Sequence, residues 1–159
     1  MPQASDISPA IVEGLYTEAL QLADETRVAF DTSAQLSRAR HTPTRQDEDL
    51  ARVALSCEAL RATTRMMHAI AWLLNQRAFL HGELSEFQLR RHGRLPPRHS
   101  DSETGQLALL PQPLRDLIEH TQAFYARIQR LDLAWNAPAP SAATAVHLMR
   151  ERLGRALAG

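Results

Sequence analysis

The sequence contains no lysine, because all 18 of its basic residues are arginines. Without lysine, neither Schiff-base catalysis nor phosphate binding by a P-loop lysine is available. The arginines are balanced by 18 acidic residues, and the formal net charge is +0. No overall electrostatic field therefore draws the chain toward nucleic acid or an anionic membrane.

Cysteine is nearly absent as well, with Cys57 alone in the chain. A single cysteine forms no intramolecular disulfide and no zinc site built from several thiolates. Cys57 has no accompanying base and orienting group, so we interpret it as a packing residue rather than a nucleophile. The histidines His81, His92 and His99 lack the spacing of metal ligands. We therefore expect no catalytic residue, no cofactor and no metal site, and we expect that the protein is not an enzyme.

Aromatic residues make up only 5% of the chain, which disfavours a platform for stacking nucleic-acid bases. The longest mostly apolar run, residues 66–74, is far shorter than the ~20 residues needed to cross a bilayer. The N-terminal residues lack the charged and apolar regions of a signal peptide. These absences predict a soluble, cytoplasmic protein.

What the chain does have is apolar residues spaced three and four apart over three long stretches, with no strand-like alternation. Pro9, Pro43 and Gly82 mark helix boundaries. We predict helices at about 9–40, 45–81 and 112–135, with a surface loop over residues 86–110. The predicted fold class is all-α: an antiparallel three-helix bundle over residues 1–136, followed by a flexible tail over 137–159 that has room for a short amphipathic helix.

The helix over 45–81 carries a regular stripe that resembles a coiled-coil seam. Its members are Leu50, Val53, Cys57, Leu60, Thr64, Met67, Ala71, Leu74 and Ala78. We expect this stripe to face the core of the bundle, and we expect truncation of Leu74 to be destabilising.

The same helix is also apolar away from this stripe, in the stretch RMMHAIAWLLNQRAFLHGELS over residues 65–85. This second ridge is either covered by residues 84–110 or used to bind another protein, such as a second copy of the chain. In the binding interpretation Trp72 is the anchor, because tryptophan is enriched at interface hot spots. The candidate protein-interaction residues are Arg65, Ala69, Trp72, Leu73, Gln76, Arg77, Leu80 and Glu83.

The densest basic run is RRHGRLPPRH, residues 90–99. It is either a solvated loop or a docking site for an acidic partner, which the forked guanidinium group of arginine suits. No helix-turn-helix pattern accompanies it, so the case for DNA binding is weak.

The segment CEALRATTRMMHAIAWLLNQRAFLHGELS, residues 57–85, resembles the signature of the RcdA family, the regulators of CtrA degradation in alphaproteobacteria. The resemblance depends on charged, aromatic and glycine positions that agree together. These are Glu58, Arg61, Thr63, Thr64, Arg65, Met67, Trp72, Leu73, Leu74, Gln76, Arg77, Ala78, Gly82, Glu83 and Ser85. Outside this segment the chain is similar to the family only in the order of its helices.

The resemblance implies a three-helix-bundle homodimer that acts as a non-enzymatic adaptor for the ClpXP protease. Such an adaptor tethers a cell-cycle regulator as cargo, CtrA or a protein like it, to the protease. The implied partners are ClpX and ClpP, a CpdR-like response regulator and a PopA-like effector, and the implied location is the cytoplasm, at the cell pole. Nucleic acid and membrane are not among the expected partners.

A second interpretation stays open on the residues alone. A helical protein-interaction or DNA-associated regulatory protein, unrelated to proteolysis, has the same composition and the same helices. The basic run favours this alternative, and the balanced net charge argues against its DNA-binding form.

Overall fold

The computed structural model describes residues 8–40, 46–97, 104–137 and 142–157, and all the regular secondary structure in these ranges is helical. The all-α prediction is therefore confirmed. The helices are α1 (Pro9–Ala39), α2 (Gln46–Leu80), α3 (Glu86–His92), α4 (Thr104–Leu107), α5 (Gln112–Trp135) and α6 (Ala142–Leu157).

The bounds of the three long helices differ from the predicted ones by at most one residue. Pro9 occupies the first turn of α1, where its missing N–H costs nothing, although the Ser8 side chain accepts no capping hydrogen bond. Three acidic residues lie in the first turn of α2, where they complement the helix dipole. Gly82 follows α2 with a φ of 76°, a conformation that glycine adopts without strain.

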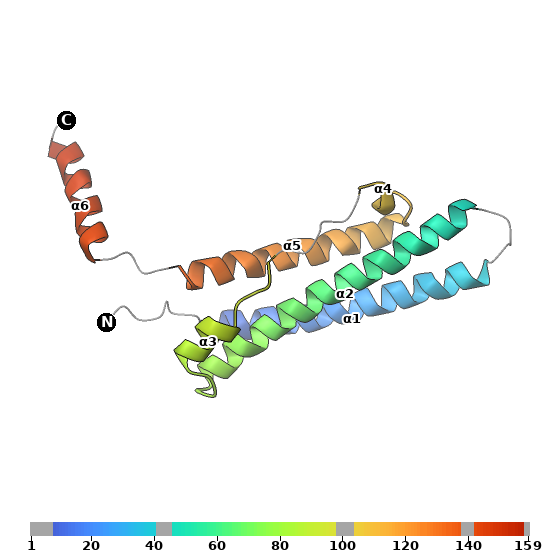
Figure 1. Ribbon diagram of the computed structural model, residues 1–159, viewed down its shortest axis with the longest axis horizontal. Helices are drawn as coiled ribbons and strands as arrows, with labels where there is room; N and C mark the ends of the chain where they lie inside the picture. The colour runs from blue at the N-terminus through green and yellow to red at the C-terminus, as the bar shows by residue number, and fades with distance from the viewer. Residues whose placement is uncertain (1–7, 41–45, 98–103, 138–141, 158–159) are drawn as a thin grey trace.

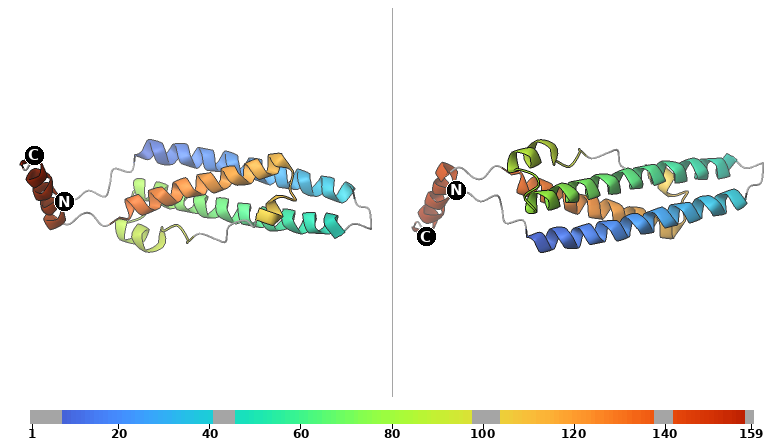
Figure 2. Two further views of the ribbon diagram at one scale, coloured as in Figure 1. Left: turned by 90° about the horizontal axis from the view of Figure 1, so that it is seen from above. Right: turned by 90° about the horizontal axis from the view of Figure 1, so that it is seen from below.

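The three long helices lie side by side (Figures 1 and 2), and contacts between them establish their directions. Helices α1 and α2 are antiparallel, since Arg77 near the end of α2 reaches Glu13 near the start of α1. Helices α2 and α5 run the same way, because Arg65 bonds Thr121 and Trp72, further along α2, bonds Asp132, further along α5. The prediction that all three helices alternate in direction is therefore wrong for this pair.

The parallel arrangement is possible because the connection between α2 and α5 returns along the bundle. Helix α3 lies near the end of α2 and α4 lies near the opposite end (Figure 1). A capping box between Ser85 and Gln88 starts α3, and Leu95 beyond it is buried in the core. The predicted loop over 86–110 thus contains two short helices, while residues 98–103 lie outside the described part of the chain.

The core uses regularly spaced apolar residues of α1 and α5 and corrects the predicted face of α2. Val12, Leu15 and Leu22 of α1 are buried, as are Ile118 and Ile128 of α5. On α2 the buried residues form the inner face: Ala54, Glu58, Ala62, Met66, Ala69, Trp72, Leu73 and Gln76. This face is the second ridge extended along the whole helix. The stripe that we expected in the core faces solvent instead.

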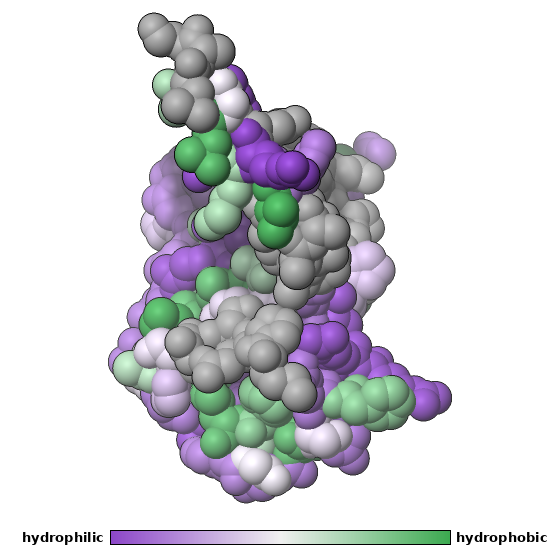
Figure 3. Space-filling model, turned by 90° about the vertical axis from the view of Figure 1, so that its left-hand side faces the viewer, coloured by the Kyte–Doolittle hydropathy of each residue, from purple (hydrophilic) through white to green (hydrophobic). Residues whose placement is uncertain are grey.

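Helix α6 stands apart from the three long helices (Figure 1), and its described side chains are all exposed. Viewed from that end of the molecule, hydrophobic residues are interspersed with hydrophilic ones on the surface (Figure 3). The tail therefore contains the amphipathic helix for which its sequence has room. Its flexibility stays a prediction, and residues 138–141 and 158–159 lie outside the described ranges.

Candidate interaction surfaces

Four of the predicted interaction residues are part of the protein's own core. Ala69, Trp72, Leu73 and Gln76 are each at most 3% exposed. The Trp72 ring stacks on Trp135 of α5, with the ring centroids 5.2 Å apart. Most of the cover comes from α1 and α5, and the connection before α5 adds Leu95. For these four residues, the hypothesis of a surface open to a partner is wrong.

Trp72 is fixed in place by a polar partner as well as by packing. Its Nε1 donates a hydrogen bond of 2.8 Å to Oδ1 of Asp132, which is itself buried. The other carboxylate oxygen of Asp132 accepts from Nε of Arg94 at 3.1 Å, and Oδ1 also accepts from Asn136. A buried indole N–H needs such an acceptor, and a buried carboxylate needs such donors.

Two more of the predicted residues are arginines that bind within the chain. Arg65 donates a 2.6 Å hydrogen bond to Thr121, and Arg77 donates a 2.6 Å hydrogen bond to Glu13. The Arg77 guanidinium also lies 4.4 Å from the centroid of the Tyr16 ring. The hydrogen bond from Arg77 to Glu13 raises the pKa of the Arg77 guanidinium. Arg65, Arg77 and Leu80 are partly buried, and Glu83 is exposed.

The surface that is open lies on the opposite side of α2. We call it the outer stripe: Leu50, Val53, Cys57, Leu60, Thr64, Met67, Ala71, Leu74 and Ala78. The exposed fractions are 53% for Leu50, 56% for Val53, 70% for Leu60, 64% for Met67 and 44% for Leu74. Scattered apolar side chains at a surface need no explanation, but a continuous line of them marks an interaction site.

The sequence pattern of this surface is the one from which we predict a core face. A strict alternation of three and four residues describes a helix face that contacts another helix. It does not say whether that second helix belongs to the same chain. Here α1 and α5 cover the inner face, so the contact that the heptad pattern predicts has no partner among the described residues.

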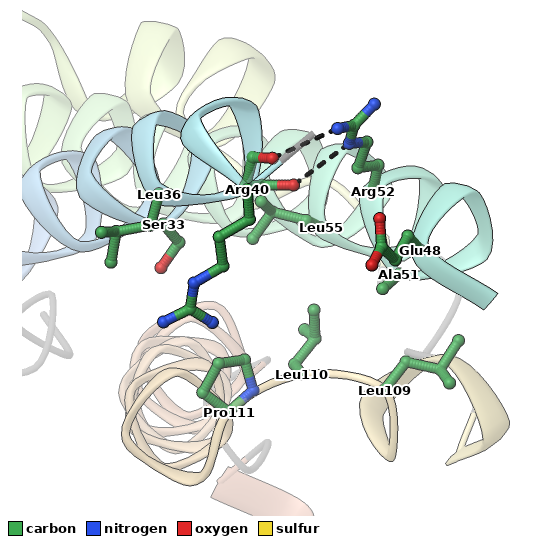
Figure 4. Close-up of a pocket in the computed structure, with 11 residues that line it drawn as sticks. Ser33, Leu36, Arg40, Glu48, Ala51, Arg52, Leu55, Leu109, Leu110 and Pro111 are labelled. Carbon is green, nitrogen blue, oxygen red and sulfur yellow. Dashed lines mark hydrogen bonds between the residues drawn. The ribbon is translucent and has the colours of Figure 1, made fainter. Parts of the chain in front are cut away.

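A pocket of about 510 Å³ lies where the end of α1 meets the start of α2 (Figure 4). Its size is typical of small-ligand sites. The apolar part of its lining consists of Leu36, Ala51, Leu55, Leu109, Leu110 and Pro111. The polar part consists of Ser33, Ser37, Arg40, Glu48 and Arg52. No local pattern in the sequence predicts this site, because its residues come from three separate segments.

The two arginines of the pocket differ in their roles. Arg52 is held by hydrogen bonds of 3.2 Å to the hydroxyl and the carbonyl oxygen of Ser37. Arg40 extends toward Pro111 across the pocket (Figure 4) and has no ion-pair partner within the part of the chain that the structure describes. Although Glu48 also lines the pocket, the Arg40 guanidinium and the apolar lining suit a group that combines an apolar body with one negative charge.

The described part of the chain offers few residues for metal binding or catalysis. No group of three or more histidine, cysteine, aspartate or glutamate side chains there lies close enough together to hold a metal ion. Cys57 is half-buried on the outer stripe, and His81 and His92 are exposed, whereas His99 lies outside the described residues. No helix in these ranges is long and apolar enough to cross a membrane.

Comparison with known proteins identifies the family of this chain. A family described as a protein of unknown function (DUF1465) matches residues 3–157, and the chain belongs to this family. No curated protein and no solved structure gives a significant match.

Proposed function

We propose that this DUF1465 protein is a non-enzymatic adaptor in regulated proteolysis, which tethers a CtrA-like cell-cycle regulator to the ClpXP protease. The observation that carries the proposal is the outer stripe of α2. Its exposed members Leu60, Met67 and Leu74 fall inside residues 57–85, the segment that resembles the RcdA family. The segment that carries the resemblance therefore also bears three exposed apolar side chains of the outer stripe.

An adaptor must bind at least two proteins, and the molecule offers surfaces that are separate. The outer stripe is apolar and runs along α2, whereas the pocket around Arg40 lies at one end of the bundle and carries charge. We assign the outer stripe to a homodimer contact and the pocket to an apolar, acidic segment of the cargo. Tethering raises the local concentration of cargo at the protease without any new chemistry.

The remaining elements of the proposal follow the resemblance. The protein is a three-helix bundle that binds the unfoldase ClpX together with a CpdR-like response regulator and a PopA-like effector. Its tail, which carries α6, is the segment available for contacts beyond the bundle, because its described side chains are exposed. The location that fits these partners is the cytoplasm, at the cell pole.

The test is a reconstituted degradation assay with purified ClpXP, a CpdR-like regulator and CtrA-like cargo. Addition of the protein should accelerate cargo loss by about tenfold or more when cargo is dilute, because tethering multiplies its effective concentration. An unchanged rate, together with no capture of the unfoldase, would overturn the adaptor proposal. Salt-sensitive binding to DNA in a mobility-shift assay would favour the alternative regulator instead.

The assignment of cargo to the pocket has its own matched variants. Arg40→Glu reverses the charge that points across the pocket, and Arg38→Glu reverses an exposed charge on the same helix end that does not line it. Arg40→Glu should abolish most of the acceleration, and Arg38→Glu should retain it. Equal loss in both variants would show that general charge matters and that the pocket does not.

A further inference from the structure

The outer stripe has the geometry of one half of a two-helix seam. Its members alternate spacings of three and four over about 36 Å from Leu50 to Leu74, at 1.5 Å per residue. From Cys57 onward one position of each repeat is large (Leu60, Met67, Leu74), and the other is smaller (Cys57, Thr64, Ala71, Ala78). Leu50 and Val53, in the first repeat, depart from this order. Such a seam packs best when the large residues of one helix face the small residues of the other.

A second copy of the same helix supplies that match if it runs in the opposite direction. Leu60 then faces Thr64 of the second copy, and Val53 faces Ala71 in the same way. Cys57 faces Met67 of the second copy, and Leu50 faces Leu74 of the second copy at each end of the seam. A twofold axis near the middle of α2 generates every contact twice, as the isologous interfaces of symmetric dimers require.

The charges beside the stripe distinguish this direction from the parallel one. A parallel pair would bring together the acidic triplets Asp47, Glu48 and Asp49 of both copies, where like charges repel. The antiparallel pair places Asp49 beside Arg77 of the second copy, and it does so at both ends. The Asp49 side chain is 78% exposed and the Arg77 side chain 30%, and the guanidinium has N–H donors beyond the Nε that binds Glu13. Opposed helix dipoles also favour this arrangement.

From this pattern we infer that two copies of the chain associate through antiparallel packing of their α2 helices, with Cys57 of each copy opposite Met67 of the other. The inference rests on the homodimer in the proposed function and adds its face, direction and register. In this dimer the pockets, which are lined by the start of α2, lie toward opposite ends and stay open. The dimer would therefore present two cargo sites, which adds avidity.

The single native cysteine allows a direct test of the register. Met67→Cys places a second thiol opposite Cys57 of the other copy, within the distance that a disulfide requires. Copper–phenanthroline oxidation should convert this variant to a covalent dimer on non-reducing gels, and it should leave the wild type uncrosslinked. Removal of the native thiol, in Met67→Cys with Cys57→Ala, should abolish the crosslink.

Two further variants identify the competing arrangements. Leu74→Cys crosslinks efficiently only if the two helices are shifted by one heptad, and Met66→Cys on the inner face should not crosslink. A wild-type crosslink through Cys57 alone would show parallel helices. Either a wild-type crosslink or a preference for position 74 overturns the proposed direction or register.

Sedimentation equilibrium separates failure of the geometry from failure of the dimer. Leu60→Asp places a carboxylate in the centre of the seam and should weaken association by at least ~30-fold, the equivalent of a hot-spot residue. Its helicity and its melting as a monomer should match those of the wild type, since Leu60 is exposed within the chain.

A dimer that forms without the crosslink between positions 57 and 67 overturns the interface while leaving the homodimer intact. A wild-type chain that stays monomeric at every concentration overturns both. The outer stripe would then bind either α6 of the same chain or a different protein. Neither result depends on the degradation assay, so the adaptor function is tested independently of the dimer.

Discussion

The two faces of α2 differ in a way that runs against the usual relation between side-chain size and burial. The inner face includes three alanines and two polar residues, Glu58 and Gln76, yet all of it is buried. The outer stripe carries more leucine, and it faces solvent. Neighbouring residues show the contrast directly: Leu73 is 0% exposed and Leu74 is 44% exposed. Burial here depends on what the other helices bring to each face.

The inner face works as a core because its small residues let α1 and α5 approach closely. The bulk comes from Trp72 and Leu73 on α2 and from Phe124, Tyr125 and Ile128 on α5. The buried Glu58 is compensated by a 2.5 Å ion pair with Arg61, which also donates to Gln106 of α4. Buried carboxylates persist only with partners of this kind.

The largest effect on stability is expected from the removal of Trp72, on the inner face of α2. Trp72→Ala should lower the free energy of unfolding by ~3–5 kcal/mol, because it leaves a large cavity beside Trp135 and removes the hydrogen bond to Asp132. Urea denaturation followed by circular dichroism gives the value. If the inner face were a partner surface, the same variant would weaken association and leave unfolding almost unchanged.

Trp72→Phe is a smaller change at the same position. It keeps an aromatic ring beside Trp135 but loses the donor to Asp132 and part of the indole volume, so the cost should be ~1–3 kcal/mol. A cost as large as that of Trp72→Ala would mean that a phenyl ring contributes almost nothing to packing at this site.

The next prediction compares the two adjacent leucines. Leu73→Ala should cost ~2–5 kcal/mol, as is usual for a fully buried leucine, whereas Leu74→Ala should cost less than ~1 kcal/mol in the dilute, monomeric protein. Denaturation curves of the two variants provide the comparison. The sequence pattern alone predicted the large cost at Leu74, so a reversed order would restore that assignment of the core.

The sequence predicted where α1, α2 and α5 begin and end, because prolines, Gly82 and the helical spacing are local signals. It also predicted that apolar residues three and four apart pack into the core, as they do on α1 and α5. On α2 it failed, because two apolar faces compete and only the packing of the whole chain decides between them. The regular heptad pattern made the exposed face look like the better core.

Two other features depend on long-range contacts that no local pattern encodes. The parallel direction of α5 relative to α2 follows from the connection that carries Leu95 into the core. The pocket combines residues from the end of α1, the start of α2 and the segment before α5. Neither the pocket nor the true surface of α2 could be identified before these segments were placed together.

A smaller effect on stability is expected at Tyr125, which lies in the same part of the core as Trp72. Its hydroxyl donates to the carbonyl oxygen of Pro96 at 3.1 Å, so Tyr125→Phe should cost ~1 kcal/mol at neutral pH. Burial raises the pKa of the Tyr125 hydroxyl, with Arg65 opposing the shift and Asp132 adding to it.

The sign of the pH effect follows from that raised pKa. The unfolded chain releases the tyrosine proton at its ordinary value of ~10, and the folded chain holds it to higher pH. The stabilisation is therefore complete below about pH 10 and is lost as the pH rises through the folded-state value. Urea denaturation at about pH 8 and about pH 11 should show a smaller gap between wild type and Tyr125→Phe at the higher pH. A constant gap would place the hydroxyl in solvent.

The central claim is that the inner face of α2 is the protein's own core and that the outer stripe is a surface for a second molecule. Met66, at 2% exposed, and Met67, at 64%, place one oxidisable sulfur on each face, one residue apart. Peroxide oxidation followed by peptide mass spectrometry, repeated over a range of protein concentrations, measures both at once. The account predicts fast oxidation of Met67 in dilute protein, slower oxidation of Met67 as the concentration rises, and slow oxidation of Met66 throughout. Oxidation of Met66 as fast as that of Met67 would contradict it.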